Sequence, residues 1–239
     1  MIEKIQGIVI NEKAYGDTSK IIDIFTKEHG IIGVIAKGSK NIKSKLRSVT
    51  ERLTYGIFTI YYKENKLSLL KEVDILDSLK NIRKDIKLIA YATYLVDLSS
   101  QVYKHSDNDN IYDILISSLK KINEGFDSLI ITNIVELKYL DYLGVMPSLT
   151  GCIVCGSSNV VTLSSSIGGY LCSKCRTNEP LISDKTMKLI RMYYYVDIEK
   201  IEKINISDQI KNQINVFLDD YYDRYTGLYL KSKEFLKKI

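Results

Sequence analysis

The hydrophobic residues of this chain change their spacing near residue 80, and this change limits the possible folds more than any other feature. Before it, short apolar or alternating runs recur with turn residues between them, as at Tyr15-Gly16-Asp17 and His29-Gly30. Such runs indicate β-strands. We expect strands at residues 5–11, 20–26, 31–36, 53–62 and 67–75. Because strands this short would leave exposed edges in an open sheet, a small closed barrel is favoured.

After residue 80 the apolar residues recur at steps of three and four, which is typical of amphipathic helices. One such series is Ile111, Ile114, Leu115, Leu119 and Ile122. Further helices are expected near residues 184–197 and 207–238. The expected N-caps are Asp107 and Asp127, and the expected C-terminal stops are Gly125 and Gly144. The sequence therefore predicts an α+β protein, with a barrel domain over residues 1–80 and a helical domain over 81–239.

The cysteines form a metal-binding pattern. All four cysteines of the chain lie within one segment, at positions Cys152, Cys155, Cys172 and Cys175. The spacing C-x2-C-x16-C-x2-C is typical of a four-thiolate zinc site, in which each close pair directs two sulfurs at one metal ion. Gly156 and Gly168-Gly169 supply the turns that such a module needs. Because protein ligands fill all four positions, we expect one structural zinc ion per chain rather than a catalytic one.

Other chemistries could use the same cysteines. An iron–sulfur cluster takes the same four ligands, and a redox-active C-x-x-C pair is a further alternative. Disulfides are disfavoured, because the N-terminus lacks a signal peptide and we expect a cytoplasmic protein. No arrangement of serine, histidine and carboxylate residues indicates catalysis, so we do not expect an enzyme.

A second pattern is a basic stretch without acidic residues between Glu28 and Glu51. The net charge of +5 permits a polyanionic partner. The stretch lies between the third and fourth expected strands, and nearby aromatic residues could stack on bases, as in barrels that bind single-stranded nucleic acid. The alternative is a solvated loop beside buried aromatics. The candidate phosphate-binding residues are Lys37, Lys40, Lys43, Lys45, Arg47 and Arg52, and the candidate stacking residues are Tyr15, Phe58, Tyr61 and Tyr62.

Several short motifs occur in a specific order along nearly the whole chain. The first are Tyr15-Gly16-Asp17, Phe25-Thr26, Gly30 and Ala36-Lys37-Gly38. Leu143-Gly144, Pro147, the cysteine pairs and Gly168-Gly169 follow, and a Leu-Lys-Ser segment ends at Ser232. In this order the chain resembles the bacterial RecO family of recombination mediators. The four-cysteine motif alone is widespread, whereas its position after such an N-terminus is specific.

The resemblance implies an N-terminal OB-fold and a helical domain with an embedded zinc module at about residues 147–180. It implies a non-enzymatic DNA repair protein of the RecF pathway that binds single- and double-stranded DNA and anneals complementary strands. Such a protein helps to load RecA onto single-stranded DNA coated by the single-strand-binding protein SSB. RecR and the C-terminal tail of SSB are the implied partners, and the cytoplasm, at the nucleoid, is the implied location. A zinc-bearing thiol oxidoreductase or redox chaperone, and an RNA-binding OB-fold protein, are the alternative functions.

Overall fold

The computed structural model describes residues 1–202 and 205–239. The chain divides into two compact units. The barrel unit comprises Met1–Glu124 and Leu230–Ile239, and the cysteine unit comprises Gly125–Tyr229. The chain therefore leaves the barrel unit once and later returns to it. The sequence instead predicts domains over residues 1–80 and 81–239. Whether residues 1–80 fold on their own stays a prediction.

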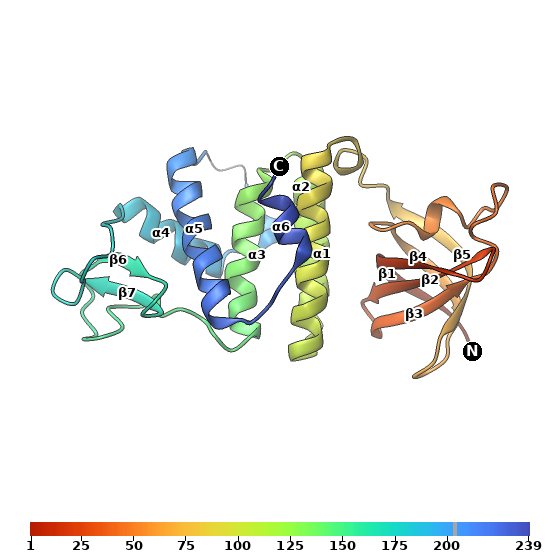
Figure 1. The fold of residues 1–239 in the computed structure, drawn as a ribbon, viewed down its shortest axis with the longest axis horizontal. Coiled ribbons are helices and arrows are strands. Elements are labelled where there is room, and N and C mark those ends of the chain that lie inside the picture. Colours follow the sequence, from red (N-terminus) through yellow and green to blue (C-terminus); the bar gives the residue numbers. More distant parts are fainter. Residues whose placement is uncertain (203–204) are drawn as a thin grey trace. The chain divides into compact units, whose positions relative to one another are not determined.

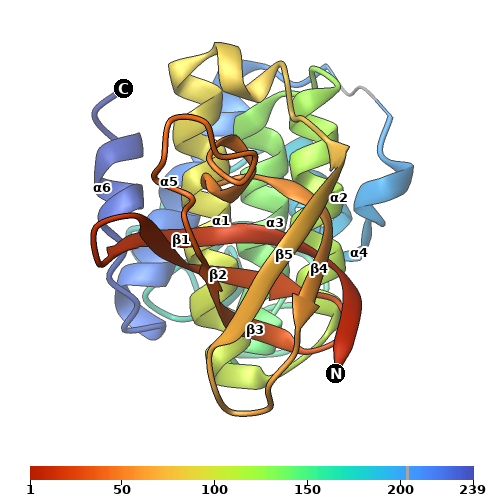
Figure 2. The ribbon, with the colours of Figure 1, turned by 90° about the vertical axis from the view of Figure 1, so that its right-hand side faces the viewer.

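Five strands close into the barrel that the sequence predicts. Around the ring their order is β1-β2-β3-β5-β4, and β3 and β5 are the pair that runs parallel (Figure 1 and Figure 2). Alternating apolar residues point inward, as in the pairs Ile22/Ile24 and Val34/Ala36. The strands are β1 (Ile2–Tyr15), β2 (Ser19–Thr26), β3 (Gly30–Ala36), β4 (Tyr55–Tyr61) and β5 (Ser68–Asp77).

Strand β1 extends four residues past the expected end at Asn11. Its last residues are mostly exposed and polar, so no hydrophobic pattern marks them, yet they pair with β2 as far as Tyr15↔Ser19. The register shifts between Val9 and Asn11, which indicates a bulge at the point where the hydrophobic run stops.

Helices α1 (Ile86–Ser106), α2 (Asn110–Asn123) and α6 (Lys231–Leu236) complete the barrel unit. The Phe25 ring of β2 lies 4.8 Å from that of Tyr103 in α1 and 5.5 Å from that of Tyr112 in α2. The expected N-cap at Asp107 is wrong. Asp107 instead ends α1 in the left-handed conformation, with φ +47°, and its N–H donates to the Tyr103 carbonyl. A short polar residue tolerates this conformation better than most.

The cysteine unit combines helices with one hairpin. Asp127 caps α3 as expected, since its carboxylate accepts from the N–H groups of Leu129 and Ile130. The stops at Gly125 and Gly144 are also confirmed, with φ +89° and +72°. The elements are α3 (Ser128–Tyr142), β6 (Val160–Ser164), β7 (Gly169–Cys172), α4 (Asp184–Tyr195) and α5 (Asp208–Tyr225).

The single helix expected over residues 207–238 is wrong. Helix α5 ends at Tyr225, where the Thr226 hydroxyl bonds back to the Tyr222 carbonyl, and Gly227 follows with φ +63°. The chain then joins the barrel unit, where α6 begins at Lys231. In the described part of the chain, no helix is long and apolar enough to cross a membrane.

Candidate metal centre and nucleic-acid interface

The hairpin of β6 and β7 brings the four cysteines together. Cys152 and Cys155 lie on a turn before β6, Cys172 ends β7, and Cys175 lies on a second turn. The four sulfurs lie within 4.8 Å of one another, and the Sγ atoms of Cys155 and Cys172 are 3.6 Å apart. Four sulfurs around one zinc ion at about 2.3 Å would be about 3.8 Å apart. The cluster therefore fits a tetrahedral metal ion.

Glycines shape both turns of this module, as the sequence predicts. Gly156 has φ +75°, and its N–H donates to the Cys152 carbonyl at 2.8 Å, which closes the first turn. Gly168 has φ +88° in the hairpin turn. A side chain at Gly169 would collide with the backbone of Ser148, to which this residue is bridged. The backbone thus requires glycine in the first cysteine turn, at Gly156, and in the turn of the hairpin that connects the two cysteine pairs.

Backbone hydrogen bonds prepare two of the thiols to ionise. Burial opposes ionisation of Cys152, but hydrogen bonds from backbone N–H groups, first that of Cys172 and then that of Cys155, lower its pKa to about 6. The pKa of Cys172 is also lowered, chiefly by the N–H of Cys175. By contrast, hydrogen bonds to the sulfurs of Cys155 and Cys172 raise the pKa of Cys175 to about 12. A metal ion would displace the protons that remain in the cluster.

The acid-free stretch forms the loop between β3 and β4. Its five cationic side chains, Lys37, Lys40, Lys43, Lys45 and Arg47, are all exposed. The loop backbone is nevertheless fixed, because the buried Ser39 hydroxyl donates to the Ala36 carbonyl and the buried Thr50 hydroxyl to that of Leu46. The charges are therefore presented from an ordered segment.

The other candidate cation, Arg52, has a different environment. Its Nη2 atom lies 2.6 Å from Oδ1 of Asp97 in α1, and each side chain is about one-third exposed (36% and 34%). The charge of Arg52 is therefore already compensated within the barrel unit.

The four candidate aromatic residues differ in their exposure and contacts. Phe58 is fully buried in the barrel core, so the expectation that it could stack on bases is wrong. Tyr62 stacks on His29, with ring centroids 4.3 Å apart. Tyr15 is 51% exposed and Tyr61 is 36% exposed, with the Lys71 ammonium 4.4 Å from the Tyr61 ring. Tyr15 and Tyr61 are thus the accessible members of the group.

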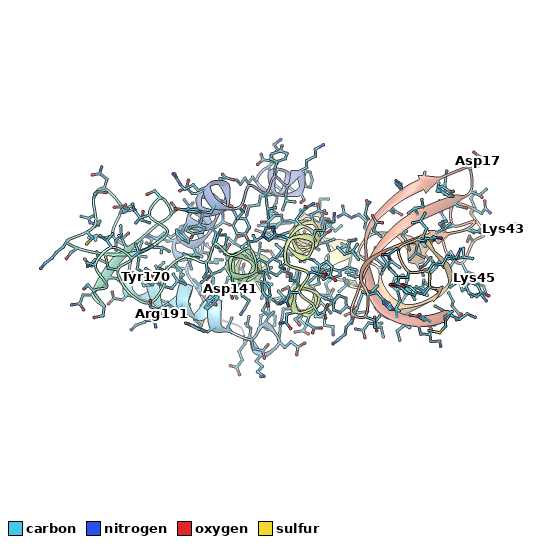
Figure 3. All side chains as sticks on the ribbon, turned by 90° about the horizontal axis from the view of Figure 1, so that it is seen from below. Asp17, Lys43, Lys45, Asp141, Tyr170 and Arg191 are labelled. Atoms are coloured by element: carbon cyan, nitrogen blue, oxygen red, sulfur yellow. The ribbon has the colours of Figure 1, made fainter. Side chains whose placement is uncertain are left out.

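Two further charged features belong to the barrel unit. Asp17, in the turn between β1 and β2, lies at the same end of the barrel as Lys43 and Lys45 (Figure 3). The Lys40 N–H donates to the Thr18 carbonyl at 2.8 Å and so ties this turn to the loop. A second group of exposed cations lies at residues 80–87, where four basic residues within eight positions were the available signal.

Comparison with known proteins covers the whole chain. The family model "Recombination protein O N terminal" matches residues 1–79, and "Recombination protein O C terminal" matches residues 83–234. The relatives from Bacillus pumilus and Bacillus subtilis, each called DNA repair protein RecO, are 35% identical over 244 residues, covering 100% of this chain and 95% of theirs. The Listeria monocytogenes serotype 4b protein of the same name is 34% identical over 243 residues, with the same coverage. The chain therefore belongs to the RecO family of non-enzymatic DNA repair proteins, as its motif order predicts.

Proposed function

We propose that this protein is a recombination mediator of the RecF pathway. It binds single- and double-stranded DNA, anneals complementary strands and helps to load RecA onto SSB-coated single-stranded DNA. Family membership supports this role, and the observation that carries it is the ordered, acid-free loop of exposed cations on a closed barrel. A protein that acts on chromosomal DNA would work in the cytoplasm, at the nucleoid.

The DNA-binding residues in this proposal are the loop cations Lys37, Lys40, Lys43, Lys45 and Arg47, together with Arg52. They contact phosphates, and the release of counterions from DNA drives binding. Arg52 contributes least, because Asp97 already offsets its charge. Neutralising the phosphates of two strands also lowers the repulsion that opposes annealing.

The metal in this proposal is one structural Zn²⁺ per chain. Cys152, Cys155, Cys172 and Cys175 would hold it, and the close approach of their sulfurs supports a tetrahedral ion. Four thiolates leave no open position for a substrate, so the ion would stabilise the hairpin and its two turns. The chemistry that the zinc supplies is structural, in keeping with a protein that is not an enzyme.

The proposed protein partners are RecR and the acidic C-terminal tail of SSB, and we place the tail on the helical region. A groove of about 800 Å³ in the cysteine unit is lined in part by the apolar residues Ile190, Val216 and Phe217. Arg224 lines this groove but is paired with Asp220 at 2.8 Å, and Glu179 lines it too, so the apolar side chains rather than the charge support this placement. Val216 is 67% exposed, so Val216→Glu should weaken binding of a labelled tail peptide to the full chain without unfolding it. Val216→Lys is the matched control. Equal affinities of the two variants for the tail peptide would show that the tail does not bind in this groove.

A strand-annealing assay tests the proposed function. Two complementary oligonucleotides are coated with SSB, and duplex formation is followed by fluorescence with and without the protein. We expect the protein to accelerate annealing and the acceleration to fall as salt rises, because salt competes for phosphate contacts. Annealing that stays at the rate of SSB alone, at every salt concentration, would show that the protein is not a mediator. Substituting matched RNA strands separates this function from RNA binding.

A further inference from the structure

Residues 80–87 carry a second cluster of positive charge, separate from the β3–β4 loop. Four of these eight residues, Lys80, Arg83, Lys84 and Lys87, are basic and exposed. The one acidic residue, Asp85, is occupied as the N-cap of α1, where its carboxylate accepts from the N–H groups of Lys87 and Leu88 at 2.8 and 3.4 Å. We call these four cations the second basic surface.

The backbone beneath the second basic surface is firmly anchored. Leu79 and Ile82 are buried, with 1% and 0% of their surface exposed. Asn81 bonds twice to Asn123 at the end of α2, from its N–H to Oδ1 at 3.0 Å and from Nδ2 to the carbonyl at 2.8 Å. The guanidinium of Arg83 donates to the Ser78 carbonyl at 3.1 Å. The segment between barrel and helix therefore presents its cations from an anchored backbone rather than from a free linker.

Negative charge separates the second basic surface from the loop. Arg83 also donates to the carbonyl of Arg52 at 3.3 Å, so the two regions meet at Arg52. At that point Asp97 neutralises Arg52, and the exposed carboxylate of Glu51 precedes it. Lys43 and Lys45 lie at the end of the barrel that points away from α1 (Figure 3). The cations therefore form two surfaces with a neutral-to-acidic interruption, and not one continuous track.

We propose that the second basic surface binds the phosphate backbone of a second nucleic-acid strand while the β3–β4 loop holds the first. This inference rests on the proposed DNA-binding function and deepens it. Two like-charged backbones repel each other, and a protein that neutralises one backbone at each surface brings the two strands together without requiring any contact to the bases. The second surface therefore serves duplex binding and annealing, and a short single strand on the loop does not need it.

The test is a triple variant, Lys80→Ala/Lys84→Ala/Lys87→Ala, in the full chain. Arg83 is left in place because it also bonds to the backbone of Ser78 and Arg52. The three lysines are exposed, so the variant should keep the thermal midpoint of the wild type. The control is Lys185→Ala/Lys188→Ala, which removes two exposed lysines from α4 in the cysteine unit.

We expect the triple variant to keep its affinity for a short single strand within about twofold. For duplex DNA, the slope of log affinity against log salt should become shallower by about 2 to 3, because each phosphate contact contributes about 0.9 to it. Annealing should slow about tenfold. The control should match the wild type in all three measurements. An equal loss of affinity for single strand and duplex would overturn the proposal in favour of one continuous site. Wild-type values in all three measurements would show that the second basic surface does not bind DNA. If the wild type itself neither binds nor anneals DNA, the proposed function fails instead.

Discussion

At the scale of single residues, Cys152 and Cys175 ionise at different pH, although all four sulfurs of the cluster lie within 4.8 Å of one another. The cysteine spacing predicted the cluster, but it could not predict this difference between Cys152 and Cys175. It depends on which backbone N–H groups point at which sulfur, and this follows only from the folded turns. Thus Cys152 has a pKa lowered to about 6, whereas Cys175 has one raised to about 12.

Removing one ligand tests the metal centre. The wild type, purified without added metal, should contain about one zinc per chain by elemental analysis. Cys172→Ser should lose it and should melt several degrees lower, because metal-binding free energy is folding free energy in such modules. Lys174→Ala, which changes an exposed residue between two ligands, should retain the metal. Iron with visible absorbance, or no metal in the wild type, would contradict the zinc assignment.

The same site predicts a pH dependence. Metal binding needs all four cysteines as thiolates, so protons compete with the metal wherever a cysteine would otherwise be protonated. At neutral pH the metal must displace the proton of Cys175, and Cys152 adds a second proton as the pH falls towards its pKa of about 6. The metal affinity should therefore weaken as the pH falls, and it should fall more steeply below about pH 6, where Cys152 is protonated as well. A metal-sensitive dye in an acid titration measures the release of the metal. Loss of metal on raising the pH from 7 to 8 would have the wrong sign.

At the scale of elements, the hydrophobic period predicted five strands and the helices, because burial of one face imposes that period. This hydrophobic period could not predict segments that bury no face. The polar end of β1 is held by pairing with β2 and carries no pattern of its own. The break after Tyr225 was also missed, because it depends on local turn chemistry at Thr226 and Gly227.

The β3–β4 loop is the element on which the proposed function depends most. Replacing Lys40, Lys43 and Lys45 with Ala should weaken DNA binding about equally across sequences, because phosphate contacts carry no sequence information. Each true contact contributes about 0.7–0.9 to the salt slope, so the slope should flatten by about 2. Because these three side chains are exposed, the variant should fold and retain zinc as the wild type does. A wild-type salt slope together with wild-type annealing would show that the loop is only a solvated surface.

At the scale of the whole molecule, the two compact units do not follow the order of the chain. The helical region predicted after residue 80 contributes α1 and α2 to the barrel unit and α3 to α5 to the cysteine unit. The chain then returns, and α6 packs against α1. Periodicity could not reveal this return, because it reports which face of a helix is buried and not what buries it.

Deleting residues 230–239 should therefore destabilise the barrel unit and spare the cysteine unit. Ser232 of α6 is buried, and the Lys233 ammonium lies 4.8 Å from the centre of the Tyr94 ring in α1. Helix α6 buries little apolar surface, with Leu236 half-buried, so the loss should be about 1–2 kcal/mol. Hydrogen exchange measured peptide by peptide should show faster exchange in α1 and the barrel strands, with α3 to α5 unchanged. Lys238→Ala, at an exposed position of the same segment, is the control. Equal acceleration in both units would instead mean that they unfold together as one cooperative body.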